Sequence, residues 1–182
     1  MARRIWTVGH STRPIETFLA LVQAHAIQQI VDVRAFPYSR RNPQFHATEL
    51  SASLQRAGLA YRHLPVLGGR RKSRPDSINQ GWRNTSFRGY ADYMQTEPFR
   101  TGLSELMTWA NDQRTAIMCA EAVPWRCHRS LIADALTSQG WEVRHIMTPT
   151  KADLHRMTPF AQQDNGTLLY PCPDAESRPS LF

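Results

Sequence analysis

Residues 115–136, TAIMCAEAVPWRCHRSLIADAL, decide the fold and carry the densest group of reactive side chains in the chain. The apolar run 116–118 predicts a short buried strand, and the apolar spacing from about Cys127 to Leu136 predicts an amphipathic helix. Between them lies a loop that begins at Cys119. Open α/β folds place their ligand sites where a strand end leads into a helix N-terminus. This loop is therefore the leading candidate for a functional site.

The rest of the chain repeats this alternation of strand and helix. Short apolar runs predict four further strands, at residues 5–8, 28–33, 59–66 and 141–146. Helical spacing predicts the intervening helices, at about residues 14–26, 48–57, 87–94 and 98–110. This order predicts an α/β protein, a single-domain three-layer sandwich whose mostly parallel sheet of about five strands is Rossmann-like.

The domain boundaries follow from where the periodic pattern stops. Residues 1–147 are expected to form one α/β domain, and residues 148–182 a C-terminal extension or tail, partly extended, that includes Cys172. A turn of helix is expected near residues 152–157. Residues 70–84 are polar with few apolar side chains to bury, so we expect them to form a mobile loop.

Length and composition limit the class of protein. The 182 residues suit one domain with a full core. No apolar run is long enough to cross a bilayer, and the first residues do not resemble an export signal, so we expect a soluble cytoplasmic protein without a membrane partner. Three cysteines are an odd number, which argues against a disulfide framework and for reduced thiols.

The charge of the chain indicates an anionic partner. The formal net charge is +7, and the 22 basic residues include only two lysines, Lys72 and Lys151. Arginine is the residue suited to bidentate contact with phosphate or carboxylate. Residues 62–88 contain seven basic residues and one acid, Asp76, so this segment alone carries +6. A codon bias toward arginine would explain the ratio of arginine to lysine, but not this clustering.

The predicted topology brings distant residues together. Strands of a parallel sheet end at the same edge, and polar or reactive residues follow four of the predicted strands. The residues expected to converge there are His10, Ser11, Asp32, Arg34, Gly68, Gly69, Arg70, Cys119 and Glu121. Residues spread over most of the chain are thus expected to form one pocket.

Five motifs point to a known family. They are TVGHS near the start, VDVRAFPYSRRNPQF, YRHLPVLGGRR, GYADYM and MCAEAVPWRCHRSLIADAL. Together they resemble a bacterial family described as domain of unknown function 488, whose most specific signature is the MCAE…CHR pair. The resemblance spans about residues 5–146, and His155 is similar to a further histidine of the family. It implies an α/β fold and brings no established activity.

The first functional hypothesis is a small enzyme that acts on an anionic small molecule, phosphate-bearing or nucleotide-like. A thiol at a helix N-terminus, next to arginine, favours the thiolate, and this argument selects Cys127. Its catalytic residues would be Cys119, Glu121, Cys127, His128 and Asp32, and its substrate-binding residues His10, Ser11, Arg34, Gly68, Gly69, Arg70 and Arg129. No cofactor is expected, and the reaction would be of the hydrolase or transferase type. The resemblance to cysteine phosphatases and rhodanese-like enzymes is one of principle only, because the cysteine-to-arginine spacing differs.

Two other functional classes remain open. In one, zinc or iron is bound by Cys119, Cys127, His128 and His10, or the two thiols form a redox pair. The Cys-x7-Cys-His spacing lacks the short Cys-x2-Cys step of structural zinc sites. In the other, nucleic acid is bound by the basic residues 62–88 with Trp82 and by the loop from Tyr38 to Phe45, where arginines alternate with aromatic side chains.

Purely structural interpretations compete with these hypotheses. Asp32 and Arg34 would then form an internal ion pair, Gly68 and Gly69 a tight turn, and Glu121 a partner for a nearby arginine.

Overall fold

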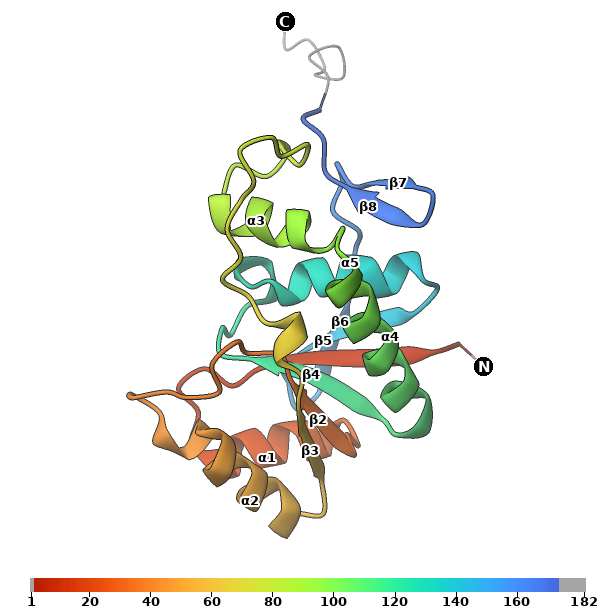
Figure 1. Ribbon diagram of the computed structural model, residues 1–182. Helices are drawn as coiled ribbons and strands as arrows, with labels where there is room; N and C mark the ends of the chain where they lie inside the picture. Colours follow the sequence, from red (N-terminus) through yellow and green to blue (C-terminus); the bar gives the residue numbers. More distant parts are fainter. Residues whose placement is uncertain (1, 174–182) are drawn as a thin grey trace, which may run out of the picture.

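The apolar runs of the chain form one twisted sheet in the computed structural model, which describes residues 2–173 (Figure 1). Its strands are β1 (Arg4–Gly9), β2 (Gln29–Asp32), β3 (Ala60–His63), β4 (Thr115–Cys119), β5 (Glu142–Thr148) and β6 (Lys151–Leu154). They lie in the order β3-β2-β4-β1-β5-β6; the first five are parallel and β6 runs antiparallel to β5. The predicted mostly parallel α/β sandwich is confirmed, with a sixth strand at one edge.

Helices cover both faces of this sheet. Helices α1 (Ile15–Ala24) and α2 (Ala47–Arg56) pack on one face, and α3 (Thr85–Tyr93), α4 (Glu97–Asp112) and α5 (Arg129–Ser138) on the other (Figure 1). Strand β4 shows why: Ala116 and Met118 belong to the core beneath α1 and α2, whereas Ile117 and Cys119 belong to the core beneath α3 to α5. Successive side chains of a strand point to opposite faces, so a wholly apolar strand requires cover on both sides.

The order of the strands determines where a ligand site can form. After β1 the chain crosses through α1 to β2 on one side of the sheet, and after β4 it crosses through α5 to β5 on the other side. Strands β1 and β4 are neighbours, paired from Trp6 opposite Ala116 to Gly9 opposite Cys119. Adjacent strands whose connections leave in opposite directions open a crevice at their carboxyl ends. This crevice is lined by residues that follow Gly9 and by residues at and after Cys119.

Three short 3-10 turns lie between the longer elements, and two of them shift a predicted boundary. They are η1 (Pro43–Phe45), η2 (Pro65–Leu67) and η3 (Pro124–Arg126), each with proline at its start. Strand β3 is shorter than expected because the chain turns at η2. Cys127 has extended backbone angles (φ −131°, ψ 147°), so the helix begins at Arg129. The prediction that Cys127 lies in the first helical turn is therefore wrong.

The basic segment expected to be a mobile loop is docked on α3. The carboxylate of Asp92 accepts hydrogen bonds from Ser77 Oγ (2.5 Å), Asn79 Nδ2 (2.7 Å) and the backbone amide of Arg74 (2.8 Å). Ser77 and Asn79 are buried. A single buried carboxylate thus orders the segment. The sequence did not predict this order, because the segment buries hydrogen-bonding groups and not the apolar side chains from which burial was predicted.

The described part of the segment expected to be a tail, up to residue 173, is also structured, and residues 174–182 lie outside the described residues. Residues 151–154 form β6 instead of the expected turn of helix, and β7 (Gln162–Asp164) and β8 (Thr167–Leu169) form a hairpin. The buried carboxylate of Asp134, on α5, holds this segment. It accepts hydrogen bonds from His155 Nε2 (2.7 Å), Thr158 Oγ1 (2.7 Å) and Tyr170 Oη (2.8 Å). No helix in the described part of the chain is long and apolar enough to span a membrane.

This role of Asp134 leads to a stability prediction. We expect Asp134→Asn to lower the free energy of unfolding by about 2 kcal/mol, because the amide leaves buried donors of the C-terminal segment without an acceptor. Urea unfolding measures this change. Asp112→Asn, at the exposed end of α4, is the matched control and should change the value by less than about 0.5 kcal/mol. Equal effects of the two variants would contradict the proposed anchoring.

Candidate functional site

The loops after β1 and β4 form the floor of the site. The ladder between these strands continues beyond their ends, since the amide of His10 donates to the carbonyl of Cys119 (2.9 Å) and that of Ser11 to the carbonyl of Ala120 (3.0 Å). Gly9 allows the loop after β4 to pass over β1, because a methyl group on Gly9 would overlap the carbonyl oxygen of Glu121. The close approach of these two loops therefore depends on the missing side chain.

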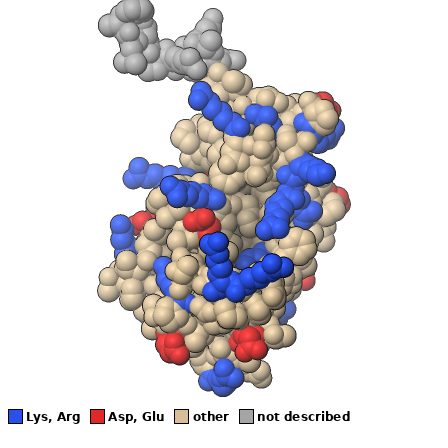
Figure 2. Space-filling view, turned by 90° about the vertical axis from the view of Figure 1, so that its left-hand side faces the viewer, with Lys and Arg blue, Asp and Glu red and all other residues tan. Residues whose placement is uncertain are grey.

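A cavity of ≈490 Å³ opens at this edge of the sheet. Eight of the residues selected from the sequence line it: His10, Arg34, Gly69, Arg70, Cys119, Glu121, Cys127 and His128. Its volume is typical of a small-molecule site. Figure 2 views this edge and shows Lys and Arg side chains around a central hollow. Of the lining arginines, Arg70 and Arg126 are exposed and Arg34 is buried.

Four of the selected residues do not line the cavity: Asp32, Ser11, Gly68 and Arg129. Asp32 is fully buried, and Arg34 donates to both of its carboxylate oxygens, with Nε at 2.9 Å and Nη2 at 2.7 Å. Tyr61 Oη donates to the same carboxylate at 2.6 Å. Asp32 therefore positions Arg34, and it does not reach the cavity in which the catalytic role expected from the sequence would place it.

His10 is held in its neutral form. Burial lowers its pKa to about 4, and the neighbouring positive charge of Arg34 acts in the same direction. The ring stacks on Phe45 at a centroid distance of 4.2 Å. Its Nδ1 lies 2.8 Å from the carbonyl oxygen of Ser11, and its Nε2 lies 3.3 Å from Arg34 Nη1. A neutral ring with the proton on Nδ1 satisfies both contacts, so His10 orients Arg34.

The two thiols lie together at the floor of the cavity. Both are buried and both line the cavity. Burial raises the pKa of both, but for Cys119 the neighbouring thiol of Cys127 and the charge of Arg129 outweigh it and lower the pKa below its usual value. The pKa of Cys127 is raised well above its usual value by burial and by Cys119. The pair thus loses its first proton from Cys119, whereas the helix argument had selected Cys127.

His128 lies beside Cys127. Its Nε2 lies 3.0 Å from the carbonyl oxygen of Val33 and its Nδ1 3.6 Å from Cys127 Sγ. Burial lowers the pKa of His128 to about 4, so the ring is neutral at pH 7, with its proton on Nε2 and an acceptor at Nδ1. A side chain on Gly69 would contact this ring. The glycine turn therefore serves close packing, because neither Gly68 nor Gly69 has a positive φ.

The site also contains residues that sequence reasoning did not select. Ala35, Phe36, Tyr38, Ser39, Ser86, Phe87, Tyr90, Ala120 and Arg126 complete the lining. The aromatic and basic pattern of the loop after β2 signalled Phe36 and Tyr38, which are 67% and 61% exposed. Helix α3 supplies Ser86, Phe87 and Tyr90 from a distant part of the chain. Tyr90 belongs to the GYADYM motif, but no local pattern indicates that it lies beside His128, and none marks Ser86 or Phe87.

Metal binding by the sulfur and imidazole groups has no geometric support. Among residues 2–173, no three His, Cys, Asp or Glu side chains are grouped so that they could hold a metal ion. The hydrogen bonds explain this result. Both ring nitrogens of His10 have protein partners, and Nε2 of His128 faces the carbonyl of Val33.

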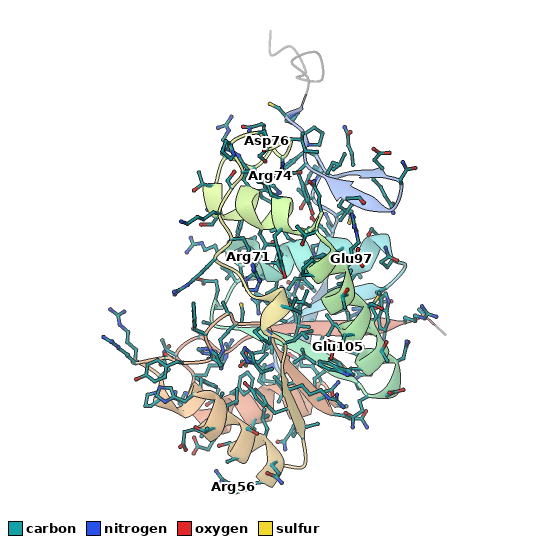
Figure 3. All side chains as sticks on the ribbon, in the orientation of Figure 1. Arg56, Arg71, Arg74, Asp76, Glu97 and Glu105 are labelled. Atoms are coloured by element: carbon teal, nitrogen blue, oxygen red, sulfur yellow. The ribbon has the colours of Figure 1, made fainter. Side chains whose placement is uncertain are left out.

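Much of the basic charge in residues 62–88 stabilises the fold. Arg71 lies over the ring of Tyr93 and donates to the carbonyl of Gly68 (3.2 Å), and Arg88 donates to the carbonyl of Trp82 (2.8 Å). Arg74 pairs with Asp76, near the outer end of α3 and away from Arg71 (Figure 3). These internal partners weaken the hypothesis that the segment is a nucleic-acid-binding surface.

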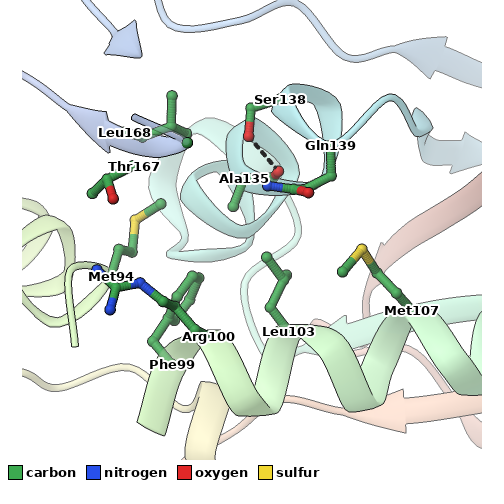
Figure 4. A pocket seen from close by; sticks show the side chains of 11 residues that line it. Met94, Phe99, Arg100, Leu103, Met107, Ala135, Ser138, Gln139, Thr167 and Leu168 are labelled. Carbon is green, nitrogen blue, oxygen red and sulfur yellow. Dashed lines mark hydrogen bonds between the residues drawn. The ribbon is translucent and has the colours of Figure 1, made fainter. Parts of the chain in front are cut away.

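A smaller cavity of ≈220 Å³ lies between α4, α5 and β8 (Figure 4). Its lining is mainly apolar, with Met94, Phe99, Leu103 and Met107 on one side and Leu168 on the other. Arg100 is its one charged residue, and none of the thiol-bearing loop reaches it. It therefore provides control positions for experiments on the main cavity.

The fold and site together define a class: a mostly parallel α/β protein with a thiol pair in an arginine-lined pocket at the switch point of its sheet. The model of the family described as domain of unknown function DUF488 matches residues 14–136, and the chain belongs to this family. The match includes all the selected residues except His10 and Ser11. Searches of curated proteins and of solved structures found no match.

Proposed function

We propose that the protein is an enzyme that acts on an anionic, phosphate-bearing or nucleotide-like molecule through the thiol pair of Cys119 and Cys127. The observation that carries this proposal is the position of two adjoining thiols at the floor of a cavity lined by exposed arginines, at the switch point between β1 and β4. Such crevices are the usual ligand sites of open α/β sheets. A thiol of lowered pKa is the usual nucleophile of covalent catalysis.

The geometry supports a division of roles. Arg70 and Arg126 bind the anion at the mouth, and the thiolate of Cys119 attacks an electrophilic atom of the substrate. The bond to the leaving group breaks, the leaving group keeps the electron pair, and Cys127, which retains its proton, supplies a proton to it. The carboxylate of Glu121, which lines the cavity, then activates water that releases the product from sulfur.

The aromatic side chains at the mouth favour a substrate with a flat ring. Phe36 and Tyr38 are exposed, although large apolar groups are normally buried, and Arg70 lies over the ring of Phe36 at 5.5 Å from its centroid. Exposed aromatic rings stack on nucleobases irrespective of their sequence. A nucleotide would therefore stack its base on the aromatic rings and pair its phosphate with the arginines.

The thiol-redox alternative stays a prediction, since adjoining sulfurs also suit a reversible disulfide.

Protection of the thiols by anions tests the proposal. We expect inorganic phosphate, and more strongly a nucleoside monophosphate, to slow the alkylation of Cys119 by neutral iodoacetamide. Labelling is followed by peptide mass mapping in a Cys172→Ser background, because Cys172 is exposed. Arg70→Met and Arg126→Met should each raise the half-protecting concentration about tenfold, the effect of one lost charge-assisted hydrogen bond.

Two controls make the protection experiment specific. Chloride at the same ionic strength accounts for general screening of charge. Arg100→Met, at the cavity between α4 and α5, removes the same charge away from the thiols and should leave the protection unchanged. If phosphate and the nucleotide protect no better than chloride, the anionic substrate is excluded.

A further inference from the structure

Arg129 is the largest fully buried side chain among the described residues, with an exposed fraction of 1%. It is the first residue of α5, directly after His128. Its Nη2 donates to the carbonyl oxygens of Glu121 (3.0 Å) and Ala122 (3.3 Å). Its Nε and Nη1 are buried and have no hydrogen-bond partner in the described structure. Part of a charged group is therefore left without any compensating contact.

No carboxylate neutralises this guanidinium. Among residues 2–173, no Asp or Glu oxygen lies within 4.0 Å of Arg129, in contrast to Arg34, which is paired with Asp32 at 2.7 Å. Transfer of an unpaired charge into a protein interior costs several kcal/mol, and buried charges are normally paired. A guanidinium stays protonated in proteins, so it cannot avoid this cost by losing its proton. The site therefore requires an anion.

The charge of Arg129 changes the pKa values of neighbouring groups. Burial is the largest cause of the lowered pKa values of His128, His145 and Arg13, and the charge of Arg129 lowers all three further. These three residues come from different elements. A guanidinium paired with a carboxylate would have much less effect on its surroundings, because the two charges would largely cancel.

A neighbouring group that can become an anion is the thiol of Cys119, whose pKa the charge of Arg129 helps to lower. Its sulfur lies 3.9 Å from the carbonyl oxygen of Glu121, the same oxygen that accepts from Arg129 Nη2. The backbone amide of Arg129 also donates to the sulfur of Cys127 at 3.5 Å. The side chain and backbone of one residue thus contact the surroundings of both thiols.

We propose that Arg129 is the built-in counter-ion of a thiolate on Cys119, so that the protein carries a charged nucleophile before any substrate binds. This inference concerns the same site as the proposed function and deepens it. Arg129 is then a positioning residue that acts through Cys119, and it leaves the binding of the substrate anion to Arg70 and Arg126. The substrate-binding role expected for Arg129 from the sequence is replaced by this one.

Titration of the thiols without any substrate tests the inference. In the Cys172→Ser background, the ultraviolet absorbance of the thiolate is followed against pH, together with the rate of iodoacetamide alkylation. We expect one thiolate to form well below the pKa of about 8.5 of a free cysteine, and Cys119→Ser to remove it. Arg129→Met should raise the midpoint by at least about one pH unit, which leaves about tenfold less thiolate at a fixed pH below both midpoints.

Two further variants separate charge from shape. Arg129→Lys retains a positive charge and should keep part of the lowered midpoint, whereas Arg126→Met removes an exposed charge of the same cavity and should leave the midpoint almost unchanged. If Arg129→Met does not fold, the free energy of unfolding of Cys119→Ser is compared with that of the parent protein at several pH values. The parent should become more stable than Cys119→Ser as the pH rises through the thiol midpoint, because only the parent then forms a thiolate that pairs with Arg129. A difference that does not change with pH contradicts the inference.

The outcomes also distinguish this inference from the proposed function. An unchanged midpoint in folded Arg129→Met overturns the inference, and loss of phosphate protection in that variant would then assign Arg129 to the substrate anion. A low midpoint that rises in Arg129→Met supports the inference, even where phosphate and nucleotide fail to protect the thiols and the proposed function is lost.

Discussion

Gly9→Ala is expected to lower the free energy of unfolding by about 4 kcal/mol. A methyl group at this position would overlap the carbonyl oxygen of Glu121 and would press on the Cα of Ala122. Both belong to backbone that cannot rotate away as a side chain can. The loop after β4 must move, and it carries the two carbonyl oxygens that accept from Arg129. Urea unfolding should show the loss, and phosphate protection of Cys119 should weaken in the same variant.

Gly58→Ala is the matched control for this substitution. Gly58 has φ +80° and open space around its Cα, so a methyl group there meets strain in the backbone but no neighbouring atom. Its expected cost is about 1 kcal/mol. The comparison therefore separates conformational strain from collision. If both variants lose the same stability, the two loops do not depend on close approach at Gly9.

The stability of the protein should fall steeply as the pH falls from 7 to 5. Burial lowers the pKa values of His10 and His128 to about 4 and that of His145 to about 3. Their stabilisation of the fold is present above the unfolded pKa of about 6.5 and is lost as the pH falls toward the folded values, since the unfolded chain binds more protons. Each histidine should account for about 2 kcal/mol between pH 7 and pH 5.

Three such losses approach the whole stability of a typical domain, so we expect acid unfolding near pH 5. Urea unfolding at several pH values measures the slope. His145→Asn should reduce the slope by about a third, because it removes one of the three rings whose pKa burial lowers. A stability that is flat between pH 7 and pH 5 would show that the buried rings are not held neutral.

Local patterns were sufficient for most of the architecture. The apolar runs and the helical spacing lie next to one another in the sequence, so they predicted five strands and five helices close to where they occur. They failed where the deciding contact is distant. Residues 151–154 form a strand because β5 offers them an edge, and residues 70–84 are ordered because Asp92 accepts from Ser77 and Asn79.

The candidate site shows the same division. Cys119, Cys127, His128 and Arg70 were selected because reactive residues follow parallel strands, and the structure brings them to one cavity. Asp32 was selected by the same reasoning, although it faces Arg34 and not the cavity. Exposure to the cavity depends on the neighbours that cover each side chain, and those neighbours come from other parts of the chain.

For this protein the sequence alone determined which residues form the five parallel strands and the helices that cover them, which strand ends meet, and which reactive groups lie near the loop from Cys119 to Arg129. Only the tertiary structure decided the chemical state of those groups. The neutral ring of His128, the order in which Cys119 and Cys127 lose protons, and the unpaired guanidinium of Arg129 all depend on burial and on hydrogen-bond partners. These properties are set by segments, distant in the sequence, that exclude water from the site, because removal of water raises the free energy of a charged group. No local pattern in the sequence records which segments do this.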